Sequence, residues 1–264
     1  MTKLGIIGAM TQEVETLVES MAECTSKEIA GSTFYEGTLD GLPAVIVQCG
    51  VGKVNAALCA QILCSCFSVT HLVNTGIAGS LCNDLDIGDM VVSRDAMYHD
   101  MDATAFGYPM GQVPQMDVVS RDAMYHDFDC VHFGYPYAKV PGMDVIAFPA
   151  DDALMAYAFS AAEAVNPGHT RIGRVASGDQ FIADKEKKDF IIVKTQALCT
   201  EMEGAAIAQT AYRNGVPFVI LRAISDKADN SAEMDYPTFE TLSAHRCAEV
   251  THRLARTLLE AESA

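Results

Sequence analysis

The sequence predicts one α/β domain, a three-layer sandwich of helices around a mixed, mostly parallel, twisted sheet. Hydrophobic residues make up 50% of the 264 residues, which is enough for a large core. Apolar runs of strand length alternate with runs of helical spacing, a pattern typical of parallel sheets covered on both faces. No Pro/Gly/Ser-rich linker interrupts the chain, so we expect a single domain over residues 1–264.

Charge and cysteine content narrow the expected partners. The formal net charge of -17 repels phosphate backbones, so nucleic acid is not an expected partner. No uncharged apolar run reaches the length of a membrane span, and we expect no signal peptide. The nine Cys show no CxxC spacing, which favours reduced thiols in a cytoplasmic protein without a membrane partner.

The first third of the chain predicts strands at 3–8, 32–39 and 42–49 and helices at 11–21 and 54–66. Thr11 is the expected N-cap of the first helix, and Glu13 follows in its first turn. Glu13 either complements the helix dipole or is presented as a functional carboxylate at the carboxyl end of the first strand. Lys53 follows a Gly-rich turn, but the full phosphate-loop pattern is missing and we reject that interpretation.

The next elements follow the same alternation. A strand at 71–75 is expected to end in a turn at 76–80, whose glycines either let a ligand approach the backbone or form an ordinary tight turn. Later come a helix at 151–164, strands at 170–177 and 217–224, and a long helix at 237–262. The charged segment 184–188 is expected to be the solvated face of a helix.

A segment in the middle of the chain is duplicated. Residues 91–100 recur letter for letter as residues 118–127, and the offset of 27 persists through the flanking motifs. Two copies are too few for a solenoid, so we interpret them as a tandem duplication of about 89–115 and 116–142. One copy is expected to serve as strand and loop while the other is extruded. The repeated Tyr-His-Asp-x-Asp lacks a further ligand cluster, which argues against a metal site.

Two carboxylates, Glu201 and Glu203, lie at an apparent strand-to-helix junction. In extended backbone both would project to one face, and ligands of open α/β sheets bind at the carboxyl ends of strands. Close carboxylates suggest a shared cation, sugar hydroxyl or proton. The alternative is a helix start at which Glu203 complements the dipole. Other strand ends carry Glu13, Phe181 and residues 222–226, which we expect to converge at one edge.

Six ordered motifs carry a resemblance to a known family. They are Gly5-Ile6-Ile7-Gly8-Ala9-Met10-x-x-Glu13-Val14, Asn74-Thr75-Gly76-x-Ala78-Gly79, Gly88-Asp89, Ser177-Gly178-Asp179-x-Phe181-Ile182, Glu201-Met202-Glu203 and Arg222-Ala223-Ile224-Ser225-Asp226. The chain resembles the 5'-methylthioadenosine/S-adenosylhomocysteine nucleosidases of the purine nucleoside phosphorylase superfamily. The resemblance covers nearly the whole chain apart from one duplicated copy. It implies a nucleoside phosphorylase-like fold, a homodimer, and no metal or organic cofactor.

The resemblance implies hydrolysis of the N-glycosidic bond of 5'-methylthioadenosine and S-adenosylhomocysteine, small adenine nucleosides, with release of adenine and a thioribose product. Asp226 would be the general acid that protonates adenine N7. Glu13 would be the general base that takes a proton from the attacking water. Glu203 would bind the ribose 2'-hydroxyl and favour a positively charged transition state.

The resemblance also implies a set of supporting contacts. Ser225 would orient Asp226, and Arg222 would hold the carboxylate network, with Glu201 as a further carboxylate. The implied contacts to substrate are stacking by Phe181, the backbone of Ile182 at adenine, Met202 under the ribose, and the segment that contains Ile77 and Gly79.

The chain departs from the family pattern at two places. Ile77 stands where the family often has Ser, so a hydroxyl contact is lost. In the family a Phe-x-Tyr segment closes the alkylthio pocket of the neighbouring subunit. Here the duplication supplies two candidates, Phe106 with Tyr108 and Phe133 with Tyr135. One pair is expected to take the family position, and the other to form an insertion near the dimer interface.

Three other functions remain as alternatives. A phosphate-dependent nucleoside phosphorylase needs an anion site in the first loop, where this chain has Glu13, and a carboxylate repels phosphate. A futalosine hydrolase of the same fold is a second alternative. The third is a catalytically silent binding protein whose pocket the duplication has impaired.

Overall fold

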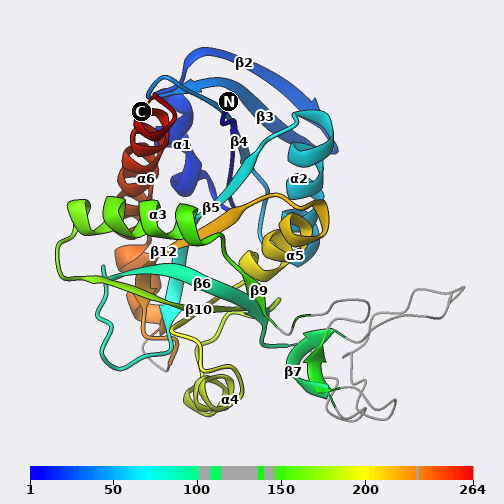
Figure 1. The fold of residues 1–264 in the computed structure, drawn as a ribbon. Coiled ribbons are helices and arrows are strands. Elements are labelled where there is room, and N and C mark those ends of the chain that lie inside the picture. The colour runs from blue at the N-terminus through cyan, green and yellow to red at the C-terminus, as the bar shows by residue number, and fades with distance from the viewer. Residues whose placement is uncertain (101–107, 114–135, 140–144, 146, 230–231, 264) are drawn as a thin grey trace, which may run out of the picture.

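A mixed sheet organises the molecule, and helices lie on both of its faces (Figure 1). The computed structural model describes residues 1–100, 108–113, 136–139, 145, 147–229 and 232–263. The main sheet has the strand order β11-β10-β6-β12-β5-β1-β4-β3-β2, and β9 pairs with β6. The predicted three-layer α/β architecture is confirmed.

The strands form two groups of parallel neighbours. The first group comprises β1 (Leu4–Gly8), β4 (Leu42–Gln48), β5 (His71–Ser80) and β12 (Phe218–Asp226), and the second β6 (Met90–Tyr98), β10 (Thr170–Ser177) and β11 (Cys199–Glu201). The antiparallel pair of β12 and β6 joins the groups, and β11 also pairs with β5. The smaller strands are β2 (Ala22–Ile29) and β3 (Ser32–Leu39) at the edge, β9 (Phe148–Pro149), and the separate pair β7 (Tyr108–Val113) and β8 (Pro136–Lys139).

Two hydrophobic cores hold the helices to the sheet. One face carries α1 (Thr11–Glu19), α3 (Asp152–Val165) and α6 (Ala232–Ser263), and the other carries α2 (Lys53–Cys66) and α5 (Gly204–Asn214). Successive strand residues point to opposite faces, so Ile6 joins the core of Leu17, whereas Ile7 joins the core of Leu63. The remaining helix, α4 (Lys185–Thr195), packs on a third, small cluster that includes Ile182.

The predicted turn at 76–80 is wrong, because β5 continues through it. The glycines there serve close packing. A Cβ on Gly76 would lie 2.3 Å from the Arg222 guanidinium, and one on Gly79 would lie 2.8 Å from the Asp226 carboxyl. Any larger residue would collide with these buried groups. Close approach to the backbone at these two glycines is therefore made by side chains of this chain, whereas approach by a ligand stays a prediction.

Two further expectations fail near the N-terminus. Met10, and not Thr11, is the N-cap of α1. The Glu13 carboxylate accepts hydrogen bonds from the Ala9 and Met10 amides, as an acidic residue in the first turn does in a capping box. The sequence also fails to predict β2. Its side chains are nearly all exposed, so no apolar period marks it, and only pairing with β3 makes it a strand.

The first duplicated copy supplies β6, and the residue before each identical segment gives a physical reason. Met90 precedes the segment 91–100 and is fully buried, at 0% exposure. Asp117 precedes the segment 118–127. If the second copy formed β6, a carboxylate would replace Met90 in the core, at a large desolvation cost. Residues 118–127 lie outside the part of the chain that the structure describes.

The described residues contain no candidate membrane span and only free cysteines. None of their helices combines the length and the apolar character that crossing a bilayer requires. Their cysteines are all free, and several are buried, including Cys59, Cys199 and Cys247.

Candidate active site

A pocket opens where β1, β5, β11 and β12 end, at the carboxyl edge of the sheet. Its lining comprises Ala9, Met10, Glu13, Val51, Ile77, Ala78, Gly79, Phe181, Thr200, Glu201, Met202, Glu203, Ser225, Asp226 and Tyr236. An adjoining hollow adds Ile182. The residues come from distant parts of the chain. The parallel strands β1, β5 and β12 bring their carboxyl ends together, and the antiparallel pairing of β11 with β5 adds residues 200–203.

Glu13 is buried at the start of α1. One carboxylate oxygen, Oε2, accepts from the Ala9 amide at 2.6 Å and the Met10 amide at 2.9 Å, while Oε1 accepts from the Ile77 amide at 3.1 Å. Burial raises the pKa of Glu13, and the charge of Arg222 and these amides oppose the rise. The result is a fixed carboxylate with more affinity for a proton than an ordinary Glu.

Arg222 lies beneath the pocket floor and is 1% exposed. Its Nη2 donates to Asn74 Oδ1 and to Glu201 Oε2. Burial would lower the pKa of Arg222, but the carboxylates of Glu201, Glu13 and Glu203 together raise it. One buried guanidinium therefore balances three glutamate carboxyls, which leaves an excess of negative charge when all three are ionised.

Glu201 and Glu203 have separate roles, so they do not form a proton-sharing or metal-binding pair. Glu201 accepts from the Gly204 amide at 2.7 Å, the Glu203 amide at 3.1 Å and the Ser177 hydroxyl. It thereby caps α5 and pairs with Arg222. Among the described residues, no cluster of three His, Cys, Asp or Glu side chains could hold a metal ion.

Glu203 stands at the N-cap position of α5, but its side chain makes no cap hydrogen bond. Its Oε1 accepts from the Gly52 amide at 2.7 Å. Burial, together with the nearby Glu201 charge, raises the pKa of Glu203 to about 8. In the unliganded protein at neutral pH, this carboxyl therefore tends to hold its proton, so dipole complementation does not explain it.

An ion cluster holds the loop that carries the Gly52 amide. The Lys53 amide donates to Asp179 Oδ1 at 2.9 Å, and the Lys53 ammonium donates to Asp100 Oδ2 at 2.5 Å. The Asp179 amide completes the cluster with a 3.0 Å bond to Asp100. This support is not predictable from the sequence, because its members come from three segments far apart in the chain.

Asp226 is 2% exposed, and both of its oxygens are held. Oδ2 accepts from the Ser225 hydroxyl at 2.9 Å, and Oδ1 accepts from the Ala228 amide at 2.8 Å. The Gly79 backbone passes close to the same carboxyl. Asp226 therefore presents a carboxyl in a fixed orientation at the end of β12.

Phe181 and Tyr236 stand at the mouth of the pocket. The Phe181 side chain is 51% exposed, so its face is open to a planar ligand. Its ring meets the Tyr236 ring edge-on at 5.4 Å, and the Tyr236 hydroxyl lies 3.1 Å from Met10 Sδ. Tyr236 is not predictable as a site residue. It stands near the start of α6 and outside the six motifs, and no local signal distinguishes it from an ordinary helix residue.

The structure brings most of the predicted site residues together. Glu13, Ile77, Gly79, Phe181, Ile182, Glu201, Met202, Glu203, Ser225 and Asp226 line the pocket or its adjoining hollow, and Arg222 lies under it. Phe106, Phe133 and Tyr135 lie outside the described residues, and Tyr108 is described only as part of the β7 backbone. Their predicted role at a neighbouring subunit stays a prediction.

Known proteins share this architecture over nearly the whole chain. Residues 3–260 match the Phosphorylase superfamily. A 5'-methylthioadenosine/S-adenosylhomocysteine nucleosidase of Halalkalibacterium halodurans is 38% identical over 93% of this chain and 94% of its own length. The Neisseria meningitidis enzyme of that name, in complex with methylthio-immucillin-A, has a TM-score of 0.84 at 32% identity, covering 97% of this chain and 100% of its own.

One solved structure carries a second name. The futalosine hydrolase of Helicobacter pylori strain 26695 has a TM-score of 0.80 at 29% identity, covering 97% of this chain and 98% of its own. Both names describe hydrolases on one fold. Sequence identity and coverage together show that the chain belongs to the 5'-methylthioadenosine/S-adenosylhomocysteine nucleosidase family of the phosphorylase superfamily.

Proposed function

We propose that the protein hydrolyses the N-glycosidic bond of 5'-methylthioadenosine and S-adenosylhomocysteine, releasing adenine and the thioribose product. One observation carries the choice of hydrolysis. The Glu13 carboxylate occupies the amides of Ala9 and Met10, which lead into α1, and the amide of Ile77 on β5. A helix N-terminus otherwise suits a phosphate ion, but here it already holds an anion. Water, and not phosphate, is then the co-substrate.

In this proposal three carboxyl groups divide the chemistry. Asp226 gives a proton to adenine N7, so that adenine leaves as a neutral base. Glu13 takes a proton from the water whose oxygen bonds to C1' of the ribose, and its raised pKa suits a base. Glu203 binds the 2'-hydroxyl, and in its ionised form it stabilises the positive charge that develops on the sugar.

The remaining residues shape the pocket. Phe181 stacks on the purine, the Ile182 backbone contacts adenine, and Met202 lies under the ribose. The aromatic pair of Phe181 and Tyr236 at the mouth limits access of water once a nucleoside is bound. Ile77 adds an apolar side chain to the pocket wall, and its backbone amide donates to the Glu13 carboxylate.

A rival phosphorylase would need a cationic phosphate site. Lys53 stands in the nearest Gly-rich loop, but its ammonium is paired with Asp100 and Asp179. Arg222 is buried under the floor and paired with Glu201. These pairings disfavour phosphorolysis.

The proposal also includes a cytoplasmic location and a role in methionine salvage.

We further propose that the single domain forms a homodimer through α2. Val54 and Leu58 are 66% and 45% exposed and lie four residues apart on one face of α2, and Val51, 50% exposed, directly precedes the N-cap of the helix. Val51 also lines the pocket. A second copy that covers this face would therefore lie next to the site. The extra duplicated copy would then be an insertion near that interface.

The function is tested by adenine release in phosphate-free buffer. We expect release from 5'-methylthioadenosine and S-adenosylhomocysteine with no stimulation by phosphate. A requirement for phosphate would identify a phosphorylase. Turnover of futalosine alone would identify the alternative hydrolase, and no turnover of any of the three would identify a silent binding protein.

A further inference from the structure

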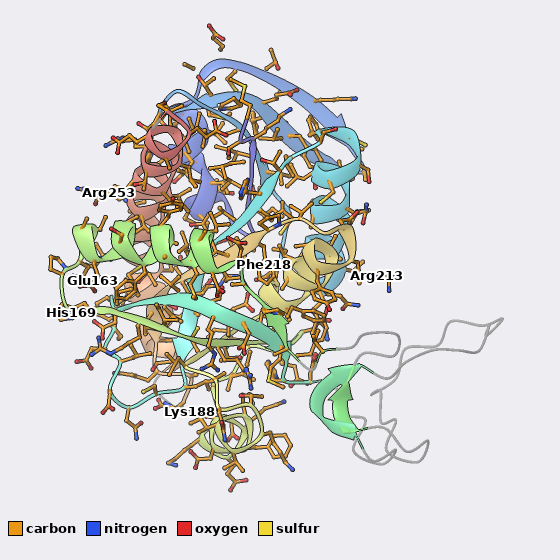
Figure 2. All side chains as sticks on the ribbon, viewed as in Figure 1. Glu163, His169, Lys188, Arg213, Phe218 and Arg253 are labelled. Atoms are coloured by element: carbon orange, nitrogen blue, oxygen red, sulfur yellow. The ribbon has the colours of Figure 1, made fainter. Side chains whose placement is uncertain are left out.

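Lys188 is buried, although the charged segment 184–188 predicts a solvated helix face. Its neighbours Lys185 and Lys187 are exposed, but Lys188 is only 6% exposed (Figure 2 labels it on α4). Its ammonium donates to the Lys227 carbonyl oxygen at 2.6 Å and lies 3.7 Å from the Asp229 carboxylate. A buried ammonium loses its hydration, and this arrangement has to compensate for that loss.

The Lys227 carbonyl belongs to the same peptide group as the Ala228 amide. That amide donates to Asp226 Oδ1 at 2.8 Å. In a trans peptide the C=O and N–H point in opposite directions, so one rigid plane connects the Lys188 ammonium to the Asp226 carboxyl. The Lys188 ammonium contacts the Lys227 carbonyl, and the Ala228 amide of the same peptide contacts the Asp226 carboxyl.

The backbone at Ala228 adopts a conformation that is unfavourable for alanine. Ala228 has φ of 50°, a left-handed conformation that costs an alanine about 1 kcal/mol or more. Ala228 is fully buried in the cluster that also contains Ile182 and Ile191. Without a partner on the carbonyl, only the hydrogen bond from the Ala228 amide to Asp226 would hold the peptide in this orientation.

We propose that Lys188 is a positioning residue for Asp226, acting through the 227–228 peptide. The ammonium fixes the carbonyl and polarises the peptide, which strengthens the amide hydrogen bond to the carboxyl. This inference rests on the proposed function, in which Asp226 is the general acid. A purely structural role at this place would be met at lower cost by an apolar side chain packed on Ile191.

The test compares Lys188→Met with Lys188→Arg and with Lys187→Met, an exposed control on the same helix. For Lys188→Met we expect kcat for 5'-methylthioadenosine to fall by at least about tenfold with KM changed less than about threefold, because geometry at the reacting group is lost while binding remains. Lys188→Arg should recover most of kcat, since it restores a charged donor. Lys187→Met should match the wild type.

A second readout does not depend on activity. Hydrogen exchange of the Ala228 amide should accelerate in Lys188→Met and stay at the wild-type rate in Lys187→Met. Should Lys188→Met fail to fold, Lys188→Gln carries both measurements with the same expected losses, because its shorter side chain does not reach the carbonyl.

The outcomes separate this inference from the proposed function. If the wild type releases no adenine, the proposed function fails, and Ala228 exchange alone decides whether Lys188 holds the peptide. In an active enzyme, a kcat within twofold of wild type, a loss confined to KM, or unchanged Ala228 exchange would each overturn the positioning role.

Discussion

At the scale of single residues, the site concentrates carboxyls that burial makes reluctant to ionise. Glu203 is 5% exposed and Glu13 is 3% exposed, and both share the charge of Arg222. Stability is lost wherever a buried carboxyl has to ionise. Functional residues are therefore expected to be the ones that destabilise the fold.

Glu203→Gln should stabilise the protein at high pH. The pKa of Glu203 rises from 4.5 to about 8 on folding, so between these values the folded protein binds more protons than the unfolded chain. Wild-type stability then falls through this window by up to about 1.4 kcal/mol per pH unit, and the neutral Gln avoids the loss. Urea unfolding should give nearly equal stabilities at pH 5 and an advantage for Gln of a few kcal/mol at pH 8.

Glu28→Gln, an exposed change on β2, serves as the control and should show no pH-dependent difference. Parallel stability curves for Glu203→Gln and the wild type would show that Glu203 is ionised in the folded protein throughout the window.

Asp226→Asn should nearly abolish adenine release. The amide keeps the size of the side chain but has no acidic proton to give to N7, so we expect a loss of about 10³-fold or more in kcat. Thermal unfolding should show that the fold persists, and Asp84→Asn on the surface should keep full activity. Activity of Asp226→Asn within a few-fold of wild type would remove the acid assignment.

At the scale of elements, the exposed face of α2 makes the proposed dimer testable. Val54→Glu combined with Leu58→Glu places two charges on the stripe, and charges at a buried apolar interface oppose association. Light scattering should show a monomer. Val193→Glu, at a side chain that is 76% exposed on α4, should leave the mass unchanged. A double variant that stays dimeric would place the interface elsewhere.

At the scale of the whole molecule, the duplication should be dispensable for folding. Deleting residues 118–144 joins Asp117 to Val145 and leaves β6 and its neighbours β10 and β12 unchanged. We expect a folded, dimeric enzyme, measured by thermal unfolding and light scattering. Failure of the shortened chain to fold or dimerise would contradict the insertion hypothesis.

A larger deletion provides the matched control. Removing residues 91–144 takes away both copies and with them most of β6, which pairs with both β10 and β12. This chain should not fold, because the sheet would lose the strand that joins its two parallel groups. Comparing the two deletions separates loss of a strand from loss of an insertion.

The sequence by itself determined the layers, most of the strands and the pocket's carboxylates. Alternating apolar runs predict β1, β4 and β12 because burial on both faces leaves a strong local signal. Asp226 could be found because it ends such a run, and Glu13 and Glu203 because each follows a strand within a few residues. The exposed strand β2 has no apolar periodicity that could predict it. The charged sequence of α4 does not distinguish the buried Lys188 from its exposed neighbours.

Only the tertiary structure decided which groups meet. β5 continues through Gly76, where the Arg222 and Glu13 side chains occupy the space that a larger residue would need. The tertiary structure brought Tyr236 to Phe181 and Lys188 to the peptide behind Asp226. It also built β6 from the first copy, since Met90 suits the core and Asp117 does not. Local pattern sets which residues can form a strand or helix, whereas these contacts depend on packing between segments far apart in the chain.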